Sequence, residues 1–114
     1  MPAKSWKVRL DDILEATRRI STYVSGITFD QFAADQRTVD AVLHNFAVIG
    51  EAARHVPPEV ESKYPIIPWA RMRGMHNVVV HEYSGIDLVI IWETATGDLP
   101  PIVPLLQGVL ELEP

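Results

Sequence analysis

The sequence predicts an all-α protein, a bundle of four or five helices that forms one domain across residues 1–114. Apolar residues recur every three or four positions in two long segments, which is the spacing that buries one face of a helix. Glycine and proline interrupt the chain between such segments, so the connections are short, as in helical bundles. One run of three valines also fits a strand, but no other segment of comparable length offers it a partner.

The N-terminal half is expected to hold two long helices. The first runs from Lys7 to Ser25 and ends at the glycine that follows. Thr28 is placed to cap a short turn, and Asp35 to cap the second long helix. Pro57 and Pro58 stop that helix, because proline cannot continue it. The second helix carries the most regular apolar stripe of the chain: Val39, Val42, Leu43, Phe46, Ile49, Ala53 and Val56.

The C-terminal half is expected to hold a turn and then further helices. The turn covers Glu59–Tyr64, and a third helix begins at Pro68, where a missing amide donor does no harm. A fourth helix runs from Ile86 to Thr96 and ends at Gly97. Asp98 can cap a last helix that has two prolines at its start.

The composition limits the kinds of function that the protein can have. The formal net charge is −5, which argues against a general nucleic-acid coat with a basic surface. The longest apolar run, Leu88–Trp92, is far below the roughly 18 to 20 residues that a membrane span needs. There is no cysteine, and no apolar segment of a secretory signal opens the chain. These features fit a cytoplasmic protein that does not contact a membrane.

The segment GMHNVVVHEY, residues 74–83, combines valines with titratable and amide side chains. On a helix, Asn77 and His81 lie one turn apart and share a face. His76 flanks that face, and Tyr83 lies at its end. A histidine near a helix end is often only a surface residue, so pattern alone leaves the role of this face open. His44 and His55 are interpreted as surface or packing residues, and Trp6, Trp69 and Trp92 as core or interface anchors.

Two kinds of chemistry compete for this face. Two histidines on one helix usually bind metal at positions i and i+4, but His76 and His81 are five apart and lack a carboxylate in register. No metal or other cofactor is therefore expected. Acid–base chemistry is the alternative, because imidazole exchanges protons near neutrality. RNA can be cut in this way when further donors hold the phosphate.

Several short motifs occur together between Asp40 and Ile102. They are IGEAA at 49–53, PW at 68–69, GM-x-N-x-x-x-H-x-Y at 74–83, GID at 85–87, a tryptophan at 92 and DLP at 98–100. In this combination and order the segment resembles the HepT-like branch of the HEPN family.

The resemblance implies a helical bundle that forms a homodimer, with the motifs of both subunits lining one cleft. It implies a toxin that acts as a metal-independent ribonuclease on RNA, and an antitoxin partner that is a minimal nucleotidyltransferase. By position, His81 is the motif histidine and Asn77 the polar residue before it. Tyr83 is the tyrosine to which the partner of some members transfers AMP.

One position departs from the family motif, in which an arginine is followed by four intervening residues and then the histidine. Here that position is His76, and Arg71 and Arg73 lie nearby at other spacings as candidate phosphate contacts. Arginine is always charged and binds phosphate with a fork of donors, whereas an ordinary imidazole is only about one-quarter protonated at pH 7. Loss of one such donor costs about 2.7–4 kcal/mol of transition-state stabilisation.

Two functions remain open on these observations. The first is a weakened endoribonuclease toxin, favoured by the retained His81, Asn77 and Tyr83. The second is a non-catalytic dimer that binds the nucleotidyltransferase, with nucleotide or RNA as a further ligand. The acidic balance and the missing arginine favour it. A purely structural dimer would leave the polar residues of the motif unexplained.

Overall fold

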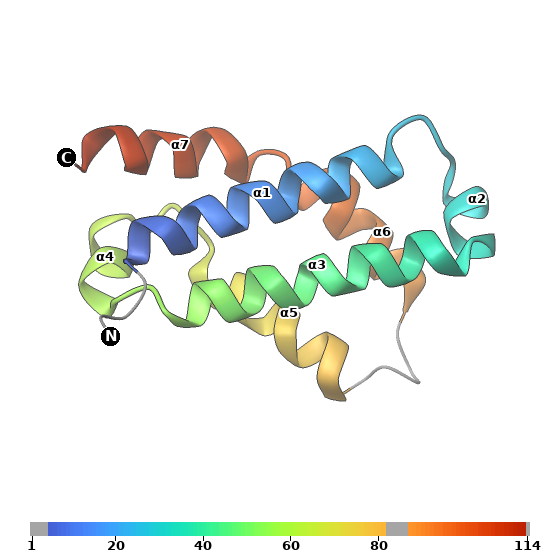
Figure 1. Cartoon of the computed structure of the whole chain (residues 1–114), viewed down its shortest axis with the longest axis horizontal. Coiled ribbons are helices and arrows are strands. Elements are labelled where there is room, and N and C mark those ends of the chain that lie inside the picture. The colour runs from blue at the N-terminus through green and yellow to red at the C-terminus, as the bar shows by residue number, and fades with distance from the viewer. Residues whose placement is uncertain (1–4, 82–86, 114) are drawn as a thin grey trace.

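A computed structural model of the chain describes residues 5–81 and 87–113, with the backbone alone for residues 78–81 (Figure 1). The described residues form α-helices and one π-helical segment and contain no strand, which confirms the predicted all-α class. The elements are α1 (Trp6–Val24), α2 (Phe29–Ala34), α3 (Gln36–Arg54), α4 (Pro58–Lys63), α5 (Trp69–His81), α6 (Leu88–Glu93), the π segment (Thr94–Asp98) and α7 (Ile102–Leu112).

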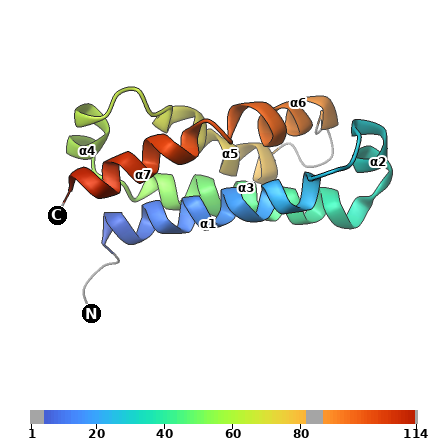
Figure 2. The same ribbon diagram turned by 90° about the horizontal axis from the view of Figure 1, so that it is seen from above.

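Two long antiparallel helices, α1 and α3, lie side by side and form the base of the bundle (Figures 1 and 2). Helix α5 crosses α3, and α7 runs back along α1. The short helix α2 closes one end of the molecule, where α1 turns into α3. The start of α1, the end of α7 and α4 meet at the opposite end (Figure 1).

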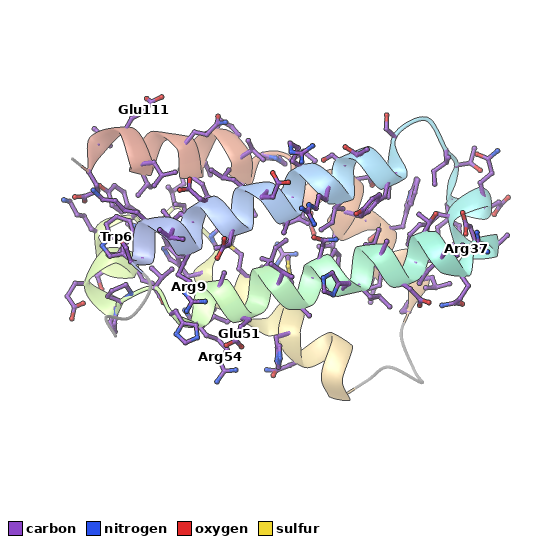
Figure 3. The ribbon with its side chains drawn as sticks, viewed as in Figure 1. Trp6, Arg9, Arg37, Glu51, Arg54 and Glu111 are labelled. Atoms are coloured by element: carbon purple, nitrogen blue, oxygen red, sulfur yellow. The ribbon has the colours of Figure 1, made fainter. Side chains whose placement is uncertain are left out.

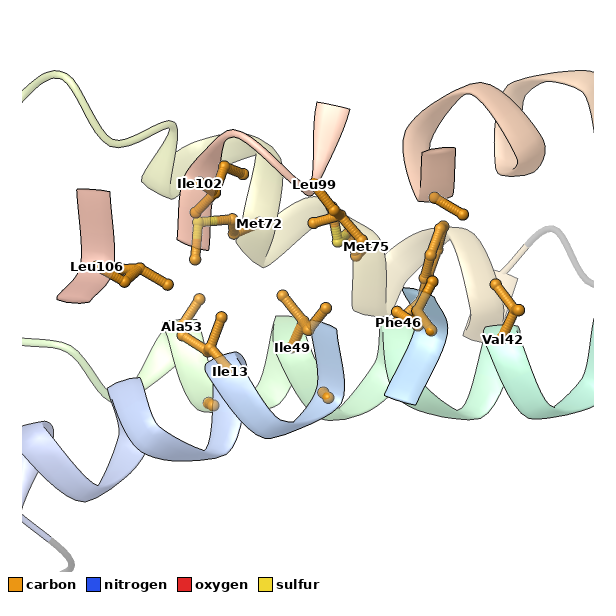
Figure 4. Close-up of a cluster of buried hydrophobic side chains, with 14 of the residues drawn as sticks. Ile13, Val42, Phe46, Ile49, Ala53, Met72, Met75, Leu99, Ile102 and Leu106 are labelled. Atoms are coloured by element: carbon orange, nitrogen blue, oxygen red, sulfur yellow. The ribbon is translucent and has the colours of Figure 1, made fainter. Parts of the chain in front are cut away.

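One hydrophobic core joins the four longest helices (Figure 4). Ile13 of α1, Ile49 of α3, Met72 of α5 and Leu106 of α7 are each completely buried. Burial of one such side chain stabilises the fold by about 1.5–3 kcal/mol relative to exposure. The apolar stripe predicted for the second helix is also confirmed, since its seven residues are all buried: Val39, Val42, Leu43, Phe46, Ile49, Ala53 and Val56.

The predicted caps at Thr28 and Asp35 are confirmed, and Asp87 caps a third helix start. Thr28 accepts a hydrogen bond from the Gln31 amide (3.2 Å), and the Gln31 side chain accepts one from the Thr28 amide (2.9 Å), which completes a capping box. The Asp35 side chain accepts from the Thr38 amide at the start of α3 (3.3 Å). Asp87 does the same for the Val89 amide of α6 (2.9 Å).

The segment expected to be a turn at Glu59–Tyr64 is instead the short helix α4, Pro58–Lys63. Pro58 stands at its first position, where the fixed backbone angle of proline suits a helix and no amide hydrogen is needed. The same proline pair therefore ends α3 and begins α4. Among the described residues, two short helices, α2 and α4, thus add to the four or five helices that the sequence predicts.

The predicted end of the fourth helix at Gly97 and the cap at Asp98 are both wrong. Gly97 and Asp98 lie inside the π segment, which closes with a hydrogen bond from the Leu99 amide to the Thr94 carbonyl (3.0 Å). Asp98 pairs with Arg71 of α5 (2.8 Å) instead of capping α7. Helix α7 starts after two prolines, with no side-chain cap. The wider π turn allows the chain to pass a glycine without ending the helix.

Glu113, just beyond α7, forms hydrogen bonds with the start of α1 and with the end of α4. Its carboxylate accepts hydrogen bonds from the Lys63 ammonium and the Tyr64 hydroxyl, each at 2.7 Å. Its backbone carbonyl accepts one from the Lys7 ammonium (3.0 Å). The Lys63 and Tyr64 donors hold the pKa of this carboxyl below its ordinary value.

Candidate functional site

Helix α5 carries the predicted motif, and its buried face fixes which motif residues meet the bundle. Trp69, Met72 and Met75 are buried, and the Trp69 indole donates to the Tyr64 carbonyl (3.0 Å). His76 follows Met72 by one turn and is half-buried at the edge of this face, whereas Asn77 is exposed. The structure therefore separates these neighbours: His76 faces the bundle and Asn77 faces solvent.

Helices α3 and α5 touch closely at Gly50, the glycine of the IGEAA motif. A Cβ atom added there would lie 2.6 Å from the Cβ and 2.9 Å from the Cα of His76, and nearer still to its amide nitrogen. Such distances are well inside van der Waals contact, so only glycine permits this crossing. Gly50 thereby fixes the backbone of His76 against α3.

His76 lines an open pocket of about 410 Å³ where α1, α3 and α5 meet. The other charged or titratable side chains on its wall are Arg9 and Asp12 of α1 and His44 and Glu51 of α3. Three small or apolar residues of α3 form the floor: Ala47, Val48 and Ala52. The volume is in the range of pockets that hold small ligands.

Glu51, one of the acids on this wall, is paired with two residues of its own helix. Its carboxylate binds His55 (3.0 Å) and Arg54 (3.1 Å), both on α3. The hydrogen bond from His55 is the main cause that holds the pKa of Glu51 below its ordinary value, and the charges of Arg54 and His76 add to it. Glu51 is therefore ionised at neutral pH, with its charge compensated by its neighbours.

The two arginines predicted as phosphate contacts lie elsewhere. Arg71 pairs with Asp98 (2.8 Å), and Arg73 pairs with Glu61 (2.6 Å). Arg71 lines a second pocket on the other side of α5, together with Met75 and Ile90. The structure thus does not bring these arginines to His76, and each has a carboxylate partner.

The remaining predicted site residues fall partly outside the described structure. His81 is the last residue of α5, and only its backbone is described. Tyr83 lies outside the described residues altogether. Asn77 and His81 are four residues apart on α5, so the backbone of His81 lies one turn beyond Asn77, as the sequence predicts.

Several charged or titratable residues of the pocket were not predicted as site residues from the sequence. Arg9 and Asp12 come from α1, and only the packing of α1 beside α3 brings them to His76. His44 was interpreted as a surface or packing residue, and it is exposed at the edge of this pocket. No local pattern in the sequence signals that these three residues share a site with residue 76.

Two further properties concern the described residues only. No group of three or more His, Cys, Asp or Glu side chains in residues 5–77 and 87–113 is arranged to hold a metal ion. None of the helices in the described ranges has the length and apolar character required to span a membrane.

The described fold is a helical bundle in which α5 carries the histidine motif and His76 lines a charged pocket, as the resemblance to HEPN domains implies for the fold. A family described as "Ribonuclease HepT-like" matches residues 13–109. The chain therefore belongs to the HepT-like ribonuclease family of HEPN proteins, and the predicted resemblance is confirmed. The match also extends into α1, beyond the Asp40–Ile102 segment whose motifs indicated the family.

Named relatives agree with this assignment. The chain is 33% identical over 111 residues to "Putative RNase MJ0127" of Methanocaldococcus jannaschii, covering 97% of this chain and 92% of the relative. It is 34% identical over 99 residues to "Probable ribonuclease HepT" of Thermococcus cleftensis, covering 87% and 90% of the two chains. No solved structure matches the chain.

Proposed function

We propose that this protein is the toxin of a toxin–antitoxin pair, a metal-independent endoribonuclease whose site is weakened by histidine at position 76. Membership of a ribonuclease family supports the activity. The observation that carries the proposal is the position of His76, which Gly50 holds at the wall of a charged pocket rather than in open solvent. That position suits a side chain that contacts a phosphate.

The proposed reaction needs only groups of the chain and of the RNA. His81 takes the proton of a 2′-hydroxyl, and the freed oxygen attacks the adjacent phosphorus to form a cyclic phosphate. The bond to the 5′-oxygen breaks, and an imidazolium returns a proton to that leaving oxygen. Asn77 orients the reacting groups as a donor, and His76 donates to the phosphate oxygens as charge develops.

The active form is proposed to be a homodimer with the motif helices near the two-fold axis. Val89 and Ile90 of α6 are 46% and 58% exposed beside the apolar pocket that Met75 lines. An exposed apolar surface next to the motif is suited to a symmetric contact. A mass of one 12.8 kDa chain in light scattering at micromolar concentration would contradict the dimer.

The catalytic role of His81 is tested with chelator-treated protein and single-stranded RNA. The wild type is expected to cut the RNA slowly and without metal, and His81→Ala is expected to remove this activity. His55→Gln is the matched control, since His55 binds Glu51 and does not line the pocket. Cleavage that survives in His81→Ala, or that disappears with the chelator, would refute the proposed mechanism.

The proposed partner is a minimal nucleotidyltransferase that transfers AMP from ATP to the hydroxyl of Tyr83, with release of pyrophosphate. The added phosphate would lie two residues beyond His81 and compete with RNA. After incubation with such an enzyme and ATP, intact-mass spectrometry should show one AMP per chain in the wild type and in Tyr23→Phe, and none in Tyr83→Phe. Tyr23 is the control because it is an exposed tyrosine on α1.

The second candidate function is a binding module without catalysis. The presence of the Asp12 and Glu51 carboxylates on the pocket wall favours it, because they oppose binding of a phosphate near His76. The same cleavage experiment separates the two functions. A wild type that binds RNA but never cuts it, in the presence or absence of metal, would support the module.

A further inference from the structure

Arg9 of α1 brings a permanent positive charge to the pocket that His76 lines. Its side chain projects from α1 toward α3, on which Glu51 lies (Figure 3). The Nε atom of Arg9 is buried and has no hydrogen-bond partner among the described residues. Buried donors of native proteins are almost always paired, so an unpaired one on a charged group suggests a ligand.

Most other arginines of the described chain are held by carboxylates. Arg18 and Arg19 bind Glu15, and Arg54 binds Glu51. Arg71 and Arg73 are likewise paired, with Asp98 and Glu61. Among the described residues, Arg9 therefore keeps a buried, unpaired donor, and it lines the same pocket as position 76, where the family motif has its arginine.

We propose that this pocket binds a phosphate group of an RNA chain, and that Arg9 supplies there the permanent cation that position 76 lacks. The inference rests on the proposed function, since it takes RNA as the ligand. Arginine is the side chain best suited to this task, because its planar fork donates to two phosphate oxygens at once. His76 and His44 add imidazole donors on the same wall.

The acidic side chains on the pocket wall favour a ligand that can donate hydrogen bonds as well as accept them. Asp12 and Glu51 face the pocket together with Arg9, His44 and His76. A bare phosphate would meet both carboxylates with no donor to offer them. A ribonucleotide unit of RNA carries the phosphate and also donates from its 2′-hydroxyl and base amino groups. The mixed wall thus fits a nucleotide of RNA better than an inorganic anion.

The shape of the surface agrees with a chain ligand. A second hollow of about 170 Å³ continues along α1 and α3 and shares Asp12, His44 and Val48 with the pocket. The two hollows adjoin each other over the α1–α3 contact. An extended strand can reach both hollows, whereas a single phosphate would fill only a small part of one.

The test measures RNA binding without cleavage, in the full-length chain carrying His81→Ala. Fluorescence anisotropy of a labelled single-stranded RNA is recorded at several salt concentrations. Arg9→Gln should weaken binding at least about tenfold, since a hydrogen bond to a charged group is lost. It should also reduce the slope of log K against log salt by about 0.7, the value for one phosphate contact on a single strand.

Arg37→Gln is the matched control, because Arg37 is exposed at the far end of α3 (Figure 3). It removes the same charge and should leave the affinity and the salt slope nearly unchanged. Equal losses in Arg9→Gln and Arg37→Gln would overturn the inference, because they would show a general charge effect. Inorganic phosphate that binds as tightly as RNA would overturn the choice of ligand.

A measurement on the chain with Arg9 intact covers the case in which Arg9→Gln does not fold. In NMR spectra, the Nε–H signal of Arg9 should shift and saturate as RNA is added, and an unmoved signal would refute the contact. The outcomes also distinguish failure of the proposed phosphate site from failure of the proposed nuclease activity. If the wild type binds RNA through Arg9 but never cuts it, the proposed phosphate site is supported and the proposed nuclease activity is refuted. If Arg9→Gln cuts RNA as fast as the wild type, the proposed phosphate site is refuted and the nuclease activity is not.

Discussion

His76→Arg is expected to raise the rate of RNA cleavage by about a hundred- to a thousandfold over the wild type. This range corresponds to about 2.7–4 kcal/mol, the typical worth of one donor placed where charge develops in the transition state. An arginine carries its charge at every relevant pH, whereas a histidine is charged only part of the time near neutrality. The pocket of about 410 Å³ beside residue 76 leaves room for the longer side chain.

Initial rates on single-stranded RNA, measured with chelator present, check this expectation. His44→Arg is the matched control, because it adds the same cation to the same pocket from α3 rather than from the motif. It should raise the rate far less than His76→Arg, since its donor is not placed at the motif position. His81→Ala combined with His76→Arg should be inactive. If His76→Arg is as inactive as that double variant, the site is no weakened nuclease and the binding module replaces it.

Gly50→Ala is expected to lower the free energy of unfolding by about 1–3 kcal/mol, the usual cost of forcing an extra methyl group into a packed site. The methyl group would overlap the backbone of His76, which cannot turn aside as a flexible side chain can. Helices α3 and α5 would have to move apart, and the buried contacts between them would loosen. Urea unfolding followed by circular dichroism measures the change.

Gly108→Ala is the control for the substitution itself. Gly108 lies within α7, and an added Cβ there meets nothing within 4 Å. Alanine at such a helical position stabilises by about 0.4–1 kcal/mol, because it restricts the unfolded chain. The two glycine variants should therefore change stability in opposite directions. A Gly50→Ala protein as stable as Gly108→Ala would mean that α3 and α5 do not touch at this point.

The sequence predicted the long helices well, because their signals are local. The apolar stripe of α3 and the caps at Thr28 and Asp35 each depend on residues a few positions apart. The errors came where two local signals competed. A proline pair both ended α3 and began α4, and Gly97 was taken as a helix end although a wider π turn continues through it.

The candidate site was predicted only as far as its own helix. The order of His76, Asn77 and His81 along α5 follows from the sequence, and the roles proposed for Asn77 and His81 come from the family resemblance. The neighbours of His76 do not follow from it, because Arg9 and Gly50 reach that residue through the packing of α1 and α5 against α3. No sequence spacing carries this information, since it is a property of how three helices cross.

The hydrogen bonds at Glu113 also bear on the rates at which the chain folds and unfolds. Lys7 and Glu113 are 106 positions apart, so their contact closes almost the whole chain into a loop. The entropy lost in such a closure is not offset until the helices between them have packed. We therefore expect the contact to form after the folding transition state, so that its free energy slows unfolding and leaves the folding rate unchanged. Substitution of Glu113 is expected to shorten the lifetime of the native state without changing the rate at which the chain reaches it.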